Sequence, residues 1–294
     1  MVLSVPVSQE VVKNVTKHLQ DDTRSLKLCS TVSRSFLVAS QQRLFSTIYI
    51  GTRLLSRKLN DLLTSSPHII PYVRGLHLLD SSEQFTEESW FCDDESFVGI
   101  LRAVRPYLET FSLMLTDYNY LEWAKMSADW QSSLLDLFAS PKLTSIRLKN
   151  ICTTDLPLGL FGGMVQLKKL GFLSCSHDSH NPPHSSLIPF LDPKTTTHQS
   201  TKRQLDALEI DGNMSTEVIE SLKRPNTLID TSQLREITIH DAKPEMLKQV
   251  WAIMQTAAKT IESFMWWDRL IDPESKFLFL GSTFILLTGQ WHDY

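Results

Sequence analysis

A short apolar pattern recurs along most of this chain and limits the folds that the chain can form. It consists of an apolar residue, two variable residues, a second apolar residue, one variable residue and a third apolar residue. Seven copies begin at residues 73, 108, 143, 167, 205, 234 and 261, as VRGLHL, LETFSL, LTSIRL, LKKLGF, LDALEI, LREITI and IESFMW. Because side chains alternate between the two faces of a strand, each copy predicts a strand with one buried face.

The spacing of the copies predicts how these strands are connected. Successive copies start 24 residues apart at the closest (143 to 167) and 38 at the widest (167 to 205), which leaves room for a helix between strands. Apolar residues at helical spacing occur in four of these intervals, at residues 94–104, 121–138, 215–222 and 244–258. The expected fold class is therefore α/β, with strand–helix repeats that build a parallel sheet.

This irregular repeat resembles leucine-rich repeats, whose template continues to Asn or Cys at the ninth position. Cys175 and Asn213 occupy that position in the fourth and fifth copies, and the other copies lack it. The resemblance implies an irregular leucine-rich-repeat-like solenoid over residues 47–294. Its strands would form a concave face and its helices the outer face.

Two segments interrupt or end this repeat. Residues 176–204 are rich in Ser, Thr, Pro and His, which predicts a flexible insertion. Residues 277–287, FLFLGSTFILL, are too few for a membrane helix, which needs about 18 apolar residues. We expect one more buried strand there, at a solenoid end that either lacks its capping unit or is truncated.

The first 46 residues have a different pattern, typical of three short helices. Apolar residues between positions 11 and 19 form one stripe on a helix that Ser8 can cap. Asp21 or Asp22 can cap a second helix, and Ser33 can begin a third. A unit of about 40 residues is marginally stable alone, so we expect these helices to pack on the rest of the chain or on a partner.

The same segment, VSQEVVKNVTKHLQDDTRSLKLCSTVSRSF, is similar to an F-box, in particular to the F-box of the leucine-rich-repeat-like proteins of mushroom-forming fungi. Glu10 and Val11 stand where that family has the Glu-Leu of its Leu-Pro-x-Glu-Leu opening. The later matches are Val15, Leu19, Asp21, Asp22, Leu26, Cys29, Val32, Ser33, Arg34 and Phe36. The chain departs from the family at Ser8, which replaces the usual proline, and at Val7, which replaces leucine.

This resemblance implies that residues 1–46 form an F-box-like head that docks onto a small Skp-type adaptor. Through the adaptor the chain would join a cullin-RING ubiquitin ligase. Such a contact requires an exposed apolar ridge with polar edges. The residues assigned to the adaptor contact are Val7, Ser8, Glu10, Val11, Val15, Leu19, Leu28 and Val32.

The variable positions of the predicted strands would form a target-binding surface on the concave face. The residues assigned to it are His77, Arg147, Lys149, Lys169, Glu209, Asp211, Glu236, His240 and Trp267. The basic residues fall in the middle copies and the acidic residues in later ones, so the charge is segregated along the sheet. A basic section could bind an acidic or phosphorylated peptide. Ordinary solvated strand positions are the alternative.

The charge balance and the cysteines exclude several classes of partner. With 29 basic and 33 acidic side chains the net charge is −4, which provides no basic surface for nucleic acid or an anionic membrane. The cysteines, Cys29, Cys92, Cys152 and Cys175, form no CxxC pair, and no secretory signal segment begins the chain. We therefore expect reduced thiols and a location in the cytoplasm or the nucleus.

No known catalytic motif occurs in the sequence. It has no nucleophile elbow, phosphate loop or metalloprotease signature. Cys175, His177, His180 and His184 form the densest set of metal-ligand residue types, but their spacing matches no standard zinc pattern. A histidine-rich surface loop is therefore expected there, and we expect no enzymatic activity, no metal and no cofactor.

The sequence thus predicts a substrate-receptor subunit of an SCF-type cullin-RING ubiquitin ligase, whose head docks the adaptor and whose solenoid binds an unknown target protein. The alternative is a leucine-rich-repeat-like interaction scaffold with a degenerate F-box and no ligase role. A third hypothesis is an enzyme built on the acidic segment at residues 80–95 or on the histidine-rich loop. It would require a defined polar pocket, and no residue pattern indicates one.

Overall fold

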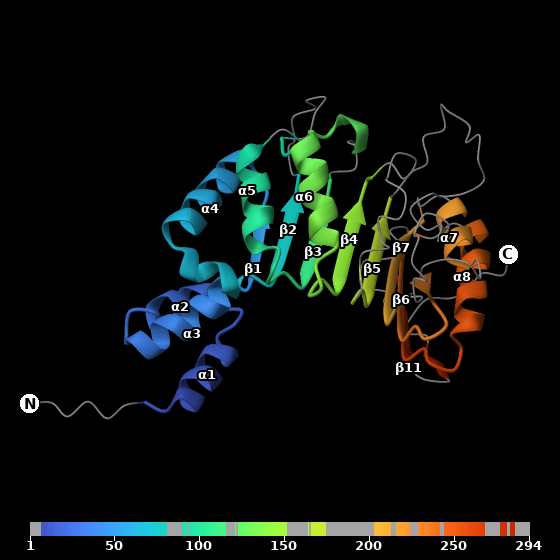
Figure 1. Cartoon of the computed structure of the whole chain (residues 1–294). Helices are drawn as coiled ribbons and strands as arrows, with labels where there is room; N and C mark the ends of the chain where they lie inside the picture. The colour runs from blue at the N-terminus through green and yellow to red at the C-terminus, as the bar shows by residue number, and fades with distance from the viewer. Residues whose placement is uncertain are drawn as a thin grey trace, which may run out of the picture.

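The computed structural model has a mixed α/β fold built on one mostly parallel sheet (Figure 1). It describes residues 7–80, 90–92, 94–115, 121, 123–151, 164, 166–174, 203–212, 216–223, 229–241, 244–267, 277–280 and 283–285. Among these residues the sheet has ten strands in the order β1-β2-β3-β4-β5-β7-β9-β10-β11-β12, which follows the chain. Neighbouring strands from β1 to β10 are parallel, so the predicted α/β fold with a parallel sheet is confirmed.

The strands are short, as the pattern predicts. The ten-stranded sheet consists of β1 (Thr47–Ile50), β2 (Gly75–Leu79), β3 (Thr110–Met114), β4 (Ser145–Lys149), β5 (Lys169–Leu173), β7 (Ala207–Asp211), β9 (Glu236–His240), β10 (Ser263–Trp267), β11 (Phe277–Leu280) and β12 (Thr283–Ile285). A separate pair is formed by β6 (Arg203–Gln204) and β8 (Ile229–Asp230). The helices are α1 (Gln9–His18), α2 (Thr23–Cys29), α3 (Arg34–Leu44), α4 (Arg53–Ser65), α5 (Glu95–Val104), α6 (Ala128–Phe138), α7 (Thr216–Lys223) and α8 (Pro244–Thr256), with the 3-10 turns η1 (Pro67–Tyr72) and η2 (Trp123–Lys125).

All seven copies of the apolar pattern form strands, namely β2, β3, β4, β5, β7, β9 and β10. Each strand starts two residues after the first apolar residue of its copy. The first, fourth and sixth pattern residues enter the core, as Val73, Leu76 and Leu78 do with no exposed surface. An eighth copy, FSTIYI from Phe45, forms β1. That copy was not predicted, although it fits the pattern.

Backbone hydrogen bonds fix the register between copies. At each step the N–H groups of the second and third pattern residues donate to one carbonyl of the preceding copy, as Arg74 and Gly75 do to Ser46 O at 2.9 and 2.8 Å. The second pattern positions also carry ion pairs along one edge of the sheet, namely Arg74–Glu109, Lys168–Asp206 and Arg235–Glu262. Residues with the same pattern position therefore form rows across the strands, and these rows place the candidate site.

Three of the four predicted helices are present as expected, and the predicted start of the fourth is wrong. Helices α5, α7 and α8 occupy the intervals predicted at 94–104, 215–222 and 244–258. The predicted helix at 121–138 is divided, because Leu121 bridges to Ile151 and α6 begins only after Ser127. The Ser127 hydroxyl caps α6 by accepting the N–H of Trp130 at 3.3 Å. Helix α4 and the turn η1 were not predicted.

The three predicted N-terminal helices are confirmed, and each begins at a predicted cap. Oxygens of Ser8, Asp22 and Ser33 accept backbone N–H groups in the first turns of α1, α2 and α3, at 3.3, 3.0 and 3.4 Å. Both α1 and α2 pack on α3, and α3 packs on η1. Within described residues 7–45, the buried apolar side chains are Val12 and Leu26. So small a core agrees with the expectation that these helices lean on the rest of the chain.

Two predictions about the later chain need correction or lie outside the described residues. Most of the 176–204 segment lies outside them, and its last two residues form β6 instead of belonging to an insertion without structure. The single strand predicted at 277–287 is wrong, because β11 and β12 are two strands that pair antiparallel. Within the described residues, no helix combines the length and the apolar character needed to cross a bilayer.

Candidate functional site

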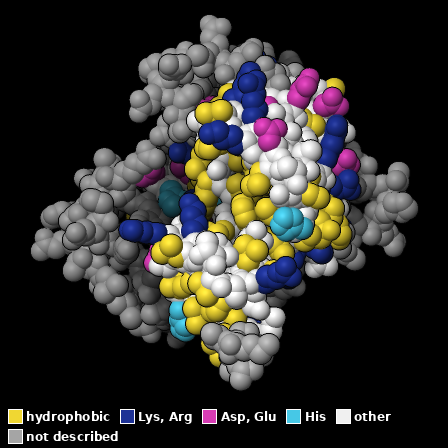
Figure 2. All heavy atoms as spheres, turned by 90° about the vertical axis from the view of Figure 1, so that its left-hand side faces the viewer, with side chains coloured by type: hydrophobic (Ala, Val, Ile, Leu, Met, Phe, Trp, Pro, Cys, Tyr) yellow, Lys and Arg dark blue, Asp and Glu magenta, His cyan; other side chains and the backbone are white. Residues whose placement is uncertain are grey.

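Exposed apolar side chains gather at the N-terminal end of the molecule. Figure 2 shows hydrophobic atoms across the side on which α1 to α4 lie. Most of the large hydrophobic residues exposed in the described chain belong to residues 7–55, and Leu135 and Trp251 are the ones beyond them. Those within 7–55 are Val7, Val11, Val15, Leu28, Val32, Leu37, Val38, Tyr49, Leu54 and Leu55. Such a concentration of exposed apolar surface is typical of a protein interface.

Helix α1 divides its apolar residues between two directions. Val12 and Thr16 lie one turn apart and are 1% exposed, whereas Val11 and Val15 are 50% and 38% exposed. Because residues four apart share a helix face, one stripe of α1 packs inward and a neighbouring stripe meets solvent. The single stripe expected from the sequence is therefore two.

Most of the residues assigned to the adaptor contact are exposed. Ser8 and Glu10 are exposed at the start of α1, and Leu19 is half-buried where α1 ends. The remaining five are apolar and exposed, and we call them the N-terminal patch: Val7, Val11, Val15, Leu28 and Val32.

The second candidate surface is the face of the sheet opposite the core, which we call the polar face. It carries the third and fifth pattern residues of each copy, together with the residue directly after the sixth, which we call the seventh position. The register places His77, Arg147 and Glu209 in the fifth-position row. Lys169 and Glu236 share the third-position row, and the seventh-position row contains Lys149, Asp211, His240 and Trp267. The assigned target-binding residues thus belong to one face, although the side chain of Trp267 lies outside the described part of the chain.

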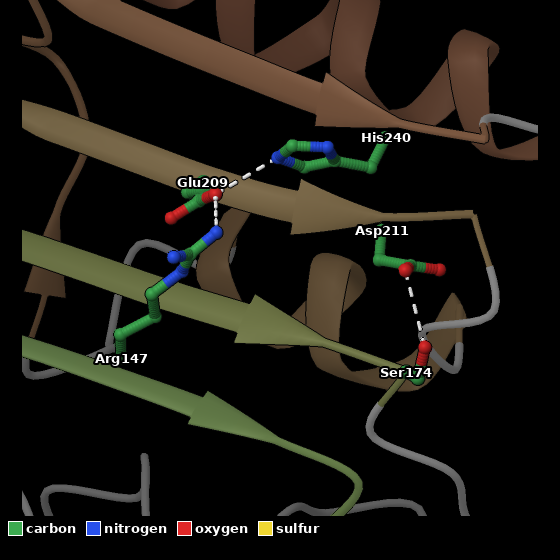
Figure 3. Close-up of polar contacts among 5 residues, drawn as sticks. All are labelled: Arg147, Ser174, Glu209, Asp211 and His240. Carbon is green, nitrogen blue, oxygen red and sulfur yellow. Dashed lines mark hydrogen bonds and ion pairs between the residues drawn. The ribbon is translucent and has the colours of Figure 1, made fainter. Parts of the chain in front are cut away.

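Three side chains form a polar cluster on this face (Figure 3). Arg147 Nη2 donates to Glu209 Oε1 at 2.5 Å, and His240 Nε2 lies 2.8 Å from the same oxygen. Burial raises the pKa of Glu209, but the hydrogen bond from His240 and the charge of Arg147 outweigh it, so the pKa of Glu209 lies below its ordinary value of 4.5. The carboxylate is therefore ionised at neutral pH.

Gly171 makes the contact between Arg147 and Glu209 possible. It lies on β5, between the strands that carry these two residues. A Cβ atom on Gly171 would lie 2.9 Å from Arg147 Cγ and 3.2 Å from Glu209 Oε2. The missing side chain thus lets two long side chains meet across an intervening strand.

Ion pairs join the basic and the acidic sections of the polar face. Arg147 pairs with Glu209, and Lys169 Nζ lies 3.4 Å from Glu236 Oε2 across the small side chain of Ala207. Two of the three predicted basic residues are therefore paired with acidic residues of the later copies.

Asp211 also differs from its assignment as a contact for a target. Its side chain is 3% exposed, and Oδ2 accepts the Ser174 hydroxyl at 3.1 Å (Figure 3). Ser174 has a φ of 48°, in the left-handed region that non-glycine residues rarely adopt. Asp211 therefore holds Ser174, the residue directly after β5, and does not present a charge to solvent.

His77 has neighbours on both sides along its row. Its ring stacks on Tyr49 with centroids 4.7 Å apart, and Nδ1 lies 2.6 Å from Ser112 Oγ. Burial and, secondly, the charge of Arg147 lower the pKa of His77 below its ordinary 6.5.

Tyr49 and Gly171 were absent from the sequence-based assignment. The sequence does contain a signal for both residues. Tyr49 is the fifth residue of the eighth copy, and Gly171 is the fifth residue of the copy that forms β5.

We predict that His77 makes the stability of the protein depend on pH. The unfolded chain takes up a proton at its ordinary pKa of 6.5, whereas folded His77 resists protonation. The stability that His77 contributes is therefore fully present above pH 6.5 and is lost as the pH falls through the lowered folded value. Denaturant titrations between about pH 7 and pH 5 should show a weaker loss for His77→Gln than for wild type. His68→Gln, at an exposed position of η1, is the matched control and should behave like wild type.

A second prediction concerns Gly171. In wild type, Gly171→Ala should lower the free energy of unfolding by about 1 kcal/mol, because the new methyl group meets Arg147 Cγ. In an Arg147→Ala background the same change should raise it by about 0.5 kcal/mol, since alanine restricts the unfolded chain more than glycine does. Equal effects in both backgrounds, measured by urea denaturation, would contradict this account of the glycine.

The described residues contain no group of three or more His, Cys, Asp or Glu side chains that could hold a metal ion. The cysteine–histidine cluster from Cys175 to His184 lies outside the described residues. A scan against models of known protein families finds no match to this chain, and a search of curated proteins finds none either.

Proposed function

We propose that this protein is the substrate-receptor subunit of an SCF-type cullin-RING ubiquitin ligase. Its three N-terminal helices act as an F-box-like head that docks a Skp-type adaptor. The parallel repeats act as a leucine-rich-repeat-like solenoid that holds a target protein. The observation that carries this proposal is the exposure of the N-terminal patch, since five of the eight residues assigned to the adaptor by the F-box resemblance are apolar side chains open to solvent.

The energetics of the N-terminal helices support a partner at this place. Described residues 7–45 keep few apolar side chains inside and many outside, among them Leu28 and Val32, which are 62% and 70% exposed. Fully burying a side chain of this size contributes about 1.5 to 3 kcal/mol. Several such side chains supply the apolar centre that a stable interface needs, and Glu10 and the α1 cap supply a polar edge.

The polar face supports the target-binding half of the proposal. Its rows present side chains from β2, β4, β5, β7 and β9 toward the same side of the sheet. Lys169 and Glu236 are about half-exposed, and their ion pair is of a kind that contributes little to folding. Polar groups of this kind are available to a partner at small cost to the fold.

Ser8 offers a test of the F-box resemblance, because the family has proline there. The φ of Ser8 is −55°, an angle that proline adopts without strain, and its backbone N–H makes no hydrogen bond within the described residues. We predict that Ser8→Pro tightens adaptor binding several-fold by fixing the entry to α1, although it removes a cap worth about 1 kcal/mol. Calorimetric titration with the adaptor measures this. Ser8→Ala, which removes the cap alone, is the control and should not tighten binding.

The alternative function is an interaction scaffold with a degenerate F-box. Ser8 in place of the family's proline favours this reading. A scaffold would keep its polar face and fail to bind the adaptor with either serine or proline at position 8. Capture of a purified Skp-type adaptor by the intact chain therefore distinguishes the two functions.

A further inference from the structure

We propose that the Arg147–Glu209 pair recognises an uncharged amide group of the target, a glutamine or asparagine side chain, and excludes phosphate. This proposal rests on the proposed function, because it assumes that the polar face holds a target. It replaces the acidic or phosphorylated ligand suggested by the basic residues of the middle copies.

The pair presents one donor beside one acceptor. Arg147 Nη2 and Glu209 Oε1 hydrogen-bond each other, and His240 holds the same carboxylate oxygen (Figure 3). Within the described residues no hydrogen bond uses Arg147 Nη1 or Glu209 Oε2, whereas Arg147 Nε is buried without a partner. A primary amide has one carbonyl oxygen that accepts and one NH2 group that donates, so it matches these two atoms together.

A ligand can reach the pair only from the solvent side. A Cβ atom on Gly171 would lie 2.9 Å from Arg147 Cγ and 3.2 Å from Glu209 Oε2, so the two side chains already fill the space over β5. The side chains of Arg147 and Glu209 remain 39% and 25% exposed, and a planar amide would approach them at this exposed surface.

The charges around the pair disfavour phosphate. Glu209 is ionised and in direct contact with Arg147, so a phosphate at the guanidinium would meet a like charge. Lys169, the nearest cation in the third-position row, is paired with Glu236. An uncharged amide meets no such repulsion and satisfies both groups of the pair.

The experiment uses the intact chain and three probes: propionamide, its charged isostere propionate, and inorganic phosphate. The side-chain Nε–H signal of Arg147, followed by NMR, reports binding. Propionamide should shift this signal at concentrations about tenfold below those at which propionate or phosphate does. Because Glu209→Gln removes the like charge and keeps the size, it should reverse the order so that propionate binds better than propionamide.

Two further variants keep the result interpretable. Gly171→Ala should weaken the propionamide response by displacing Arg147 from Glu209, and Lys58→Ala, on the exposed side of α4, should leave it unchanged. A larger response to phosphate than to propionamide in wild type would overturn the proposal, and so would an unchanged order in Glu209→Gln. These measurements need no adaptor. A chain that responds to propionamide as expected but does not capture the adaptor would therefore reject the ligase function alone. A chain that captures the adaptor but does not prefer propionamide would reject the amide site alone.

Discussion

An aspartate in place of Leu148 is expected to unfold the repeat sheet. Leu148 is 2% exposed on β4, where its register partners Leu113 and Phe172 lie on either side. Removing a buried leucine costs about 2 to 5 kcal/mol, and placing an unpaired carboxylate there adds several more. This sum is comparable to the total stability of a typical domain, about 5 to 15 kcal/mol.

Circular dichroism and thermal melting of the purified chain measure this effect. Leu148→Asp should give insoluble protein or protein without a cooperative transition. Ser145→Asp is the matched control, because it adds the same charge to the same strand on the polar face, where its register partner is Lys169. A cooperative transition in Leu148→Asp close to that of wild type would mean that the sheet does not bury this row.

The Val11→Asp, Val15→Asp double variant is expected to abolish adaptor capture without unfolding the chain. Both valines lie on the exposed stripe of α1, so neither change places a charge in the core. In a desolvated interface, each aspartate should cost at least about 2 kcal/mol. Together the two changes correspond to a loss of affinity on the order of a thousandfold.

The matched control for this variant is Leu135→Asp. Leu135 is an exposed hydrophobic residue on α6, far along the chain from the N-terminal patch. The Leu135→Asp variant should capture the adaptor as wild type does. Both this variant and the double variant should melt at the wild-type temperature. Equal capture by wild type and the double variant would show that the adaptor, if bound, contacts another surface.

The strands could be predicted from the sequence because their signal is local. Alternation within six residues determines which face of a strand is buried, and each predicted copy forms a strand. The copy at Phe45 was missed because its first two residues fall within the first 46 residues, which were assigned to the helical head. The division of the predicted helix at 121–138 depends on a cap at Ser127, which helical spacing alone does not reveal.

The candidate sites could be predicted only in part. Sequence spacing identified the residues of the polar face, but the ion pair between Arg147 and Glu209 joins residues 62 positions apart. Such a contact depends on register and on the absence of a side chain at Gly171. The contact of Asp211 with Ser174 likewise joins residues 37 positions apart. On α1, the pattern grouped Val11 with Val12, and only packing on α3 separates the exposed residue from the buried one.

The most direct test of the proposed function is whether the intact, folded chain binds a purified Skp-type adaptor. Size-exclusion chromatography with light scattering, followed by calorimetric titration, gives both stoichiometry and affinity. The F-box-like head predicts a one-to-one complex that is lost in the Val11→Asp, Val15→Asp variant and tightened by Ser8→Pro. A chain that melts cooperatively yet shows no complex at adaptor concentrations of tens of micromolar, with serine or with proline at position 8, would contradict the proposed ligase function.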